Sequence, residues 1–128
     1  MEAIHENVHI HTNVTKMSEL MQKCDVAISA AGSTMYELCT VGVPILSFSF
    51  VDNQERIVQT FADKGLVHFG GDYVKDGETM VAELTKKLCE LIASKELRQC
   101  YSEKAELLVD GKGAERIADA LRNLAKGN

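Results

Sequence analysis

The sequence has few of the features that mark membrane or secreted proteins. It contains one proline, no tryptophan and 5% aromatic residues. No apolar run approaches the roughly 20 residues that a membrane-spanning helix needs. The polar start MEAIHENVHIH also lacks the apolar core of a signal peptide. We therefore expect a cytoplasmic protein that does not insert into a membrane.

Basic residues and paired cysteines are also scarce. The 14 lysines and arginines are outnumbered by 19 acidic residues, which gives a formal net charge of −5 and a pI near 5.3. A nucleic-acid or membrane-surface partner would need a concentrated basic face, so neither is expected, and any phosphate must be held locally. The four cysteines, Cys24, Cys39, Cys89 and Cys100, form no CxxC pair. Neither a zinc site nor a disulfide framework is indicated, and buried free thiols are expected.

The apolar residues predict a single α/β domain over residues 1–128. With 128 residues and 45% hydrophobic content, the chain can bury one core but not two. From His9 to Val67 short apolar runs alternate with amphipathic segments, which is the pattern of βαβ units. We expect a Rossmann-like parallel sheet of about four strands with flanking helices. The expected strands are Val8 to His11, Asp25 to Ala30, Pro44 to Phe50 and Leu66 to Phe69.

Helices are expected between these strands and in a helical C-terminal tail. Thr15 can cap one helix, Ser33 can cap a second, and a third is expected to begin at Asp52 and end at Gly65. From about residue 79 the pattern is helical only, with a turn at residues 110–113. The tail carries three apolar stripes: Met80, Leu84, Leu88 and Leu91; Leu97, Tyr101 and Leu108; Ile117, Leu121 and Leu124.

The segment SAAGSTMYE, residues 29–37, lies where a buried strand is expected to end and a helix to begin. Its small residues let a ligand approach the backbone. The N–H groups at a helix start favour a phosphate or diphosphate without any basic side chain. Open α/β sheets also bind ligands beyond the carboxyl ends of their strands, where this loop must lie.

A simpler interpretation of Gly32-Ser33-Thr34 is a tight turn with a serine that caps the helix. A second segment favours a binding site. Asp52-Asn53-Gln54 follows the next strand at another expected helix start, so two neighbouring strand ends face one crevice. Amide side chains donate and accept hydrogen bonds at once, which suits sugar hydroxyls and phosphate oxygens.

The order CDVAISAAGSTMYELCTVGVPILSFSFVDNQ resembles the C-terminal, nucleotide-binding domain of GT-B-type UDP-sugar enzymes. The resemblance is greatest to the UDP-sugar hydrolase of pseudaminic acid biosynthesis and its spore-coat polysaccharide relatives, and more distant to the lipid II N-acetylglucosaminyltransferase. It covers roughly residues 8–72, and the tail DGKGAERIADAL also resembles the hydrolase group. A small-residue loop, a glutamate, a GxP turn and a DNQ motif recur in one order with one spacing.

The resemblance implies roles for particular residues. The loop of Ala31, Gly32, Ser33 and Thr34 would hold the diphosphate of UDP or a UDP-sugar through N–H groups and hydroxyls. Glu37, one helical turn on, would accept hydrogen bonds from both ribose hydroxyls, which suits a carboxylate near a helix start.

Three further positions complete the implied site. Asn53 and Gln54 would reach the sugar or the diphosphate, and the backbone of Val14 would read the uracil edge. The chain begins at what resembles the third strand of the family's domain, without the first glycine-rich loop and the N-terminal domain that carries the catalytic histidine. No catalytic residue is therefore assigned, and we expect the isolated chain to be inactive.

The missing strands would leave one edge of the sheet open. An unpaired apolar strand recruits a partner. We therefore expect either that Val8 to His11 pairs with Asp25 to Ala30 or that two chains associate across this edge as a homodimer.

Three functions fit these residues. The first is UDP-sugar binding in a hydrolase or glycosyltransferase of surface polysaccharide or glycan biosynthesis, with an N-terminal catalytic domain as partner. The second is a non-catalytic subunit of a split glycosyltransferase that binds an acceptor-binding subunit, and the third is a phosphosugar-binding regulatory module.

No metal or cofactor is expected. Of His5, His9 and His11, only the last two share a strand face, and no carboxylate is placed with them. His68 is expected to be a strand residue rather than a general base. Ser33 lacks the GxSxG frame of a serine hydrolase.

Overall fold

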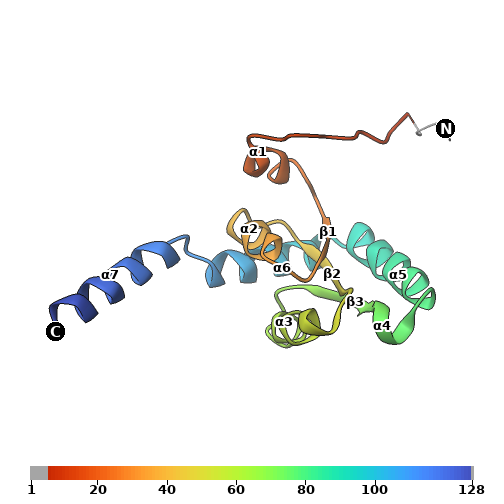
Figure 1. Cartoon of the computed structure of the whole chain (residues 1–128). Helices are drawn as coiled ribbons and strands as arrows, with labels where there is room; N and C mark the ends of the chain where they lie inside the picture. The colour runs from red at the N-terminus through yellow and green to blue at the C-terminus, as the bar shows by residue number, and fades with distance from the viewer. Residues whose placement is uncertain (1–5, 128) are drawn as a thin grey trace.

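The computed structural model describes residues 6–127, which form a three-stranded parallel sheet flanked by helices (Figure 1). The strands β1 (Ala27–Ala30), β2 (Ile45–Ser49) and β3 (His68–Asp72) lie side by side in sequence order. Ala27 is opposite Ile45 in the register, and Leu46 is opposite His68. The helices are α1 (Met17–Met21), α2 (Thr34–Thr40), α3 (Asp52–Asp63), α4 (Tyr73–Asp76), α5 (Thr79–Ala93), α6 (Lys95–Leu108) and α7 (Gly113–Lys126).

The central strand β2 is covered on both faces. Ile45, Leu46 and Ser47 are consecutive and have no exposed surface, which is the pattern of a parallel strand between two layers of helices. Ile45 packs in the main core with side chains of α2 and α3. Leu46 lies on the other face, where it and Leu84 of α5 both approach Gly70 of β3. The predicted α/β fold class is confirmed, with three strands rather than four.

The strand expected at Val8 to His11 is absent. Within the described residues this segment has no ladder partner, and Val8 and Ile10 are 54% and 69% exposed. The described residues before α1 run well apart from the sheet (Figure 1). Because Val8 and Ile10 stay largely exposed, little apolar burial offsets the backbone entropy that would be lost if this segment were ordered as a strand. The expected pairing within one chain is wrong, whereas association of two chains stays a prediction.

The helix boundaries follow their local signals, but the expected caps do not all form. The third helix begins at Asp52 as predicted, and Gly65 follows its end with a φ of 66°. Thr15 is not the cap of α1, because Lys16 occupies that position without a side-chain capping bond. Ser33 does precede α2, yet its hydroxyl makes no capping bond either.

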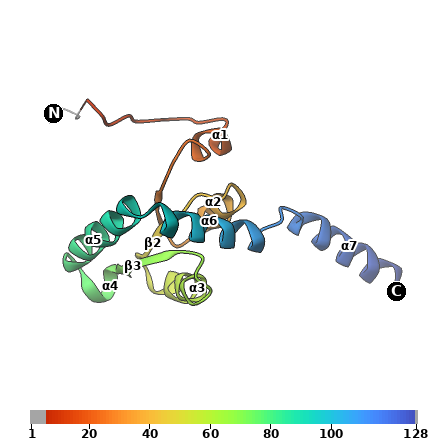
Figure 2. The same ribbon diagram turned by 180° about the vertical axis from the view of Figure 1, so that it is seen from behind.

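The C-terminal helices bury two of the three predicted stripes to different degrees. Met80 and Leu91 of α5 are buried, whereas Leu108 at the end of α6 is 42% exposed. Helix α7 projects from the rest of the molecule in both views (Figure 1, Figure 2), and its three stripe residues, Ile117, Leu121 and Leu124, are exposed. None of the helices in residues 6–127 is long and apolar enough to cross a membrane.

The expectation of buried thiols holds for one cysteine. Cys39 of α2 is buried, and this burial raises its pKa to about 11. Cys24, Cys89 and Cys100 are exposed. The expectation was wrong for these three because Cys24 lies in the loop before β1, while Cys89 and Cys100 occupy the solvent faces of α5 and α6.

Candidate functional site

Two loops of the predicted site follow neighbouring strands at the carboxyl edge of the sheet. β1 ends at Ala30 and β2 at Ser49, and the strands are parallel and adjacent. The N–H of Ala31 donates to the carbonyl oxygen of Phe48 at 2.9 Å, which continues the ladder beyond β1. The loop at residues 31–34 is therefore fixed to the end of β2, close to the start of α3.

Buried contacts beneath the loop hold α2 in place. Ala31 is 1% exposed and Met35 is fully buried. The hydroxyl of Ser47 donates to the carbonyl of Ser29 at 3.0 Å and lies 3.1 Å from the sulfur of Met35. Ala31 is thus an anchor whose N–H is already used and whose side chain lies in the core, which explains why alanine is accommodated here.

The donors of the loop lie just beyond this anchor. No hydrogen bond in the described part of the chain uses the N–H of Gly32 or Ser33, nor the side-chain hydroxyls of Ser33 and Thr34. Ser33 and Thr34 are exposed. Because Ser33 does not cap α2, the interpretation of this turn as a simple capping turn loses its main support. The hydroxyls and N–H groups are available to an anion.

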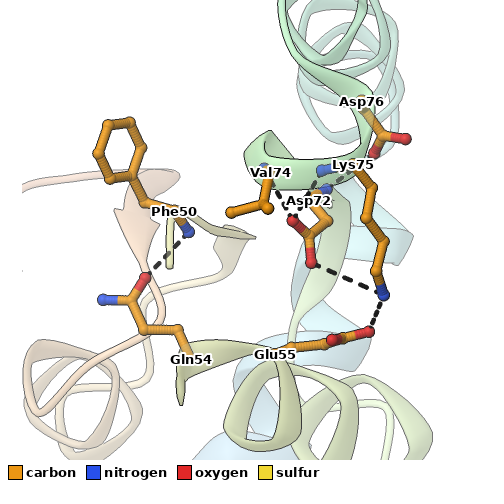
Figure 3. A network of polar contacts seen from close by, with 7 residues as sticks. All are labelled: Phe50, Gln54, Glu55, Asp72, Val74, Lys75 and Asp76. Atoms are coloured by element: carbon orange, nitrogen blue, oxygen red, sulfur yellow. Dashed lines mark hydrogen bonds and ion pairs between the residues drawn. The ribbon is translucent and has the colours of Figure 1, made fainter. Parts of the chain in front are cut away.

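The remaining motif residues flank this loop. Glu37 lies in the first turn of α2, is exposed, and has no ion pair or side-chain hydrogen bond within residues 6–127. Asn53 is exposed in the first turn of α3. Gln54 is half-buried, and its Oε1 accepts the N–H of Phe50 at 3.0 Å (Figure 3).

Val14 is not placed on this edge by a strand. It is half-buried in the segment that precedes α1, and that segment lies apart from the sheet (Figure 1). The structure therefore places the loop, Glu37, Asn53 and Gln54 along two strand ends. Val14 lies in the segment before α1 instead.

A network of charged residues at the end of β3 extends this edge (Figure 3). Asp72 accepts the N–H groups of Val74 and Lys75 at 2.9 and 3.3 Å and so caps α4. Its own N–H donates to Asp76 at 2.9 Å. Lys75 pairs with Glu55 of α3 and lies 4.0 Å from Asp72.

This network keeps Asp72 ionised. Burial raises the pKa of Asp72, but the two N–H groups that it accepts and the charge of Lys75 help to lower it below the ordinary value. The pKa of Lys75 is raised, chiefly by its hydrogen bond with Glu55. This cluster was not predicted from the sequence, although an aspartate directly after a strand, with free N–H groups two and three residues on, is an ordinary capping signal.

The turn at residues 110–113 has a structural explanation. Asp110 accepts the N–H of Lys112 at 2.9 Å and a guanidinium hydrogen bond from Arg116 at 2.7 Å, and Gly111 has a φ of 71°. The bond from Arg116 lowers the pKa of Asp110. As predicted, the turn ends α6 and begins α7. It borders a cavity of about 490 Å³ lined also by Tyr36, Phe61, Leu66, Leu108 and Val109, which contains no residue of the predicted site.

His68 lies away from the candidate site. His68 is the first residue of β3, at the amino edge, and its ring nitrogens lie 3.0 Å from Tyr101 and 3.0 Å from Glu90. The prediction that it is a strand residue is confirmed. Within residues 6–127, no three histidine, cysteine or acidic side chains are arranged to hold a metal ion, and His5 lies outside the described residues.

Comparison with known proteins identifies relatives that match most of the chain. Residues 2–121 match the Glycosyltransferase family 28 C-terminal domain. The spore coat polysaccharide biosynthesis protein SpsG of Bacillus subtilis (strain 168) is 36% identical over 110 residues, which cover 84% of this chain and 31% of that protein.

A second relative is the UDP-N-acetylglucosamine–N-acetylmuramyl-(pentapeptide) pyrophosphoryl-undecaprenol N-acetylglucosamine transferase of Sulfurovum sp. (strain NBC37-1). It is 28% identical over 131 residues, which cover 95% of this chain and 36% of the transferase. The chain thus spans about a third of the length of these relatives. No solved structure matches it significantly.

Proposed function

The chain belongs to glycosyltransferase family 28, of which it forms the C-terminal domain, and from this premise we propose that it binds the UDP part of a nucleotide sugar at the carboxyl edge of its sheet. The observation that carries the proposal is the pair of neighbouring strand ends. One presents unused N–H groups and hydroxyls, and the other begins a helix of 12 residues. Ligands of open α/β sheets bind at such edges.

The donors at residues 32–34 suit a diphosphate. The N–H groups of Gly32 and Ser33 and the hydroxyls of Ser33 and Thr34 can each donate to a phosphate oxygen, and none is engaged elsewhere in the described chain. Hydrogen bonds to charged oxygens are stronger than those between neutral groups. A protein with a formal net charge of −5 can hold a phosphate in this local way.

Glu37 is proposed to bind the ribose, and Asn53 and Gln54 the sugar side of the ligand. An exposed carboxylate one turn beyond the loop offers two oxygens to the two hydroxyls of a ribose. Asn53 offers a free amide at the start of α3, and Gln54 retains its NH₂ group while its Oε1 accepts from Phe50.

The reaction of the whole protein is proposed to be cleavage or transfer of the sugar in surface polysaccharide or glycan biosynthesis, with a second domain that supplies the catalytic base. The names of the two relatives support this proposal: one is a spore coat polysaccharide biosynthesis protein and the other is an N-acetylglucosamine transferase. The position of His68 also fits this proposal. Its ring nitrogens lie within hydrogen-bond distance of Tyr101 and Glu90 at the amino edge of β3, which is the edge opposite the proposed binding site.

Calorimetric titration with UDP, UMP and glucose 6-phosphate tests the binding proposal. We expect UDP to bind with a Kd of roughly 0.1 to 1 mM and UMP more weakly, because UMP has one phosphate for the loop donors. Glucose 6-phosphate should not bind measurably. Binding of glucose 6-phosphate with no binding of UDP would contradict the proposal and favour a phosphosugar-binding module instead.

A further inference from the structure

Two aromatic rings lie stacked beside the candidate site. Phe50 follows β2, and Tyr73 begins α4 at the end of β3. Their ring centroids are 4.8 Å apart with an angle of 18° between the planes, although the residues are 53% and 42% exposed. Each ring is therefore held by the other while much of the pair faces solvent. Exposed apolar groups in a fixed arrangement are typical of binding surfaces.

Phe50 is joined directly to the proposed site. Its N–H donates to Oε1 of Gln54 at 3.0 Å (Figure 3), and the exposed amide of Asn53 precedes Gln54 in the first turn of α3. Ring faces and amide groups thus occur together within residues 50–54. A pyranose ring presents C–H groups, which suit the negative face of an aromatic ring, and hydroxyls, which suit amides.

The charges at the end of β3 indicate which part of a nucleotide sugar would lie here. Glu55, Asp72 and Asp76 bring three carboxylates to this end of the sheet, with Lys75 between the first two (Figure 3). This surface repels a diphosphate. The unused donors of the loop at residues 32–34, on the β1 side, attract one. A ligand bound across both strand ends would place its diphosphate toward β1 and its sugar toward β3.

We propose that the stacked pair of Phe50 and Tyr73 is the surface on which the sugar ring packs, and that the adjacent carboxylates favour a neutral sugar over a sugar acid. The inference rests on the proposed function, because it assigns a further part of the same site. UDP-glucose therefore binds more tightly than UDP, and UDP-glucuronic acid gains less from its sugar than UDP-glucose does.

The test is a set of titrations with UDP, UDP-glucose and UDP-glucuronic acid. The variants are Phe50→Leu and Tyr73→Leu, which keep an apolar side chain but remove the ring. Tyr73→Phe keeps the ring, and Val74→Ala alters a neighbouring residue that is 57% exposed and has no ring. Circular dichroism checks that each variant is folded.

We expect both leucine variants to bind UDP-glucose about threefold to tenfold more weakly than the parent, with the Kd for UDP changed by less than about twofold. Tyr73→Phe and Val74→Ala should retain parental affinities. Unchanged binding of UDP-glucose by both leucine variants would overturn the inference. Equal weakening of UDP and UDP-glucose would place the base rather than the sugar on the rings, and would also overturn it.

Two further outcomes separate this inference from the function on which it rests. UDP-glucuronic acid that binds as tightly as UDP-glucose would overturn the assignment of a neutral sugar. No binding of UDP to the folded parent would overturn the proposed function, and the sugar surface with it.

Discussion

Gly70→Ala tests how α5 packs on the sheet. Gly70 lies within β3, and a Cβ at this position would stand 2.3 Å from Cδ2 and 3.1 Å from Cγ of Leu84, with Cδ1 of Leu46 at 3.4 Å. The shortest distance is far below a van der Waals contact. Leu84 must therefore leave its position over the sheet, while Leu46 is fully buried and cannot give way easily.

The expected cost of Gly70→Ala is moderate. Extra atoms in a packed core cost about 1–3 kcal/mol, and replacing glycine returns about 0.4–1 kcal/mol through the unfolded state. Leu84 is only half-buried, so it can turn partly toward solvent. We expect a net loss of about 1–2 kcal/mol, which lowers the Tm by roughly 3–8 °C.

The assay is urea unfolding of Gly70→Ala, Leu84→Ala and the double variant. The double variant should cost less than the sum of the single variants by about 1 kcal/mol, because the added methyl group occupies space that Leu84 leaves. Gly113→Ala is the matched control, since a Cβ there meets nothing within 4 Å and alanine favours a helix. A Gly70→Ala variant as stable as the parent, or strict additivity in the double variant, would refute this description of the packing.

Four other measurements follow from the site and its surroundings. Glu37→Gln should weaken UDP binding by about 1.5 to 3 kcal/mol without loss of fold, and equal affinity of the parent for uridine and deoxyuridine diphosphates would contradict the ribose role. The isolated chain should hydrolyse no UDP-sugar. Hydrolysis by the purified chain that is lost in His68→Ala would contradict this prediction.

Because the bond from Arg116 lowers the pKa of Asp110, this pair stabilises the fold fully above the unfolded carboxyl pKa of about 3.9. The contribution disappears as the pH falls through the lower folded value, so Asp110→Asn should reduce the pH dependence of stability there. Ellman's reagent near pH 8 should modify three thiols quickly and Cys39 slowly, because burial raises its pKa to about 11; four equally fast thiols would contradict its burial.

The elements that the sequence predicted well are those with local signals. Helix α3 begins at Asp52 and is followed by Gly65 in a left-handed conformation, as its apolar spacing and glycine predict. β2 was predicted from its continuous apolar run, because a strand buried on both faces needs such a run. The small-residue loop at residues 31–34 was recognised for a similar reason, since a strand, a glycine and a helix start are all local features.

The features that the sequence did not predict depend on distant partners. The alternation in Val8 to His11 is a pattern for a strand, but a strand exists only beside another one. The apolar stripe of α7 follows from its spacing, but the sequence does not indicate whether another element packs on it. Phe50 and Tyr73 stack across 23 positions of the chain, and such a contact follows from the order of the strands rather than from local spacing.

The measurement that tests the central claim most directly is the map of backbone amide shifts of the isotope-labelled chain on titration with UDP. We predict that the largest shifts fall on residues 32–34 and 52–54, at the carboxyl ends of β1 and β2, and that they saturate together with one Kd. Saturable shifts that avoid both segments, or the absence of saturable shifts at several millimolar UDP, would contradict the claim.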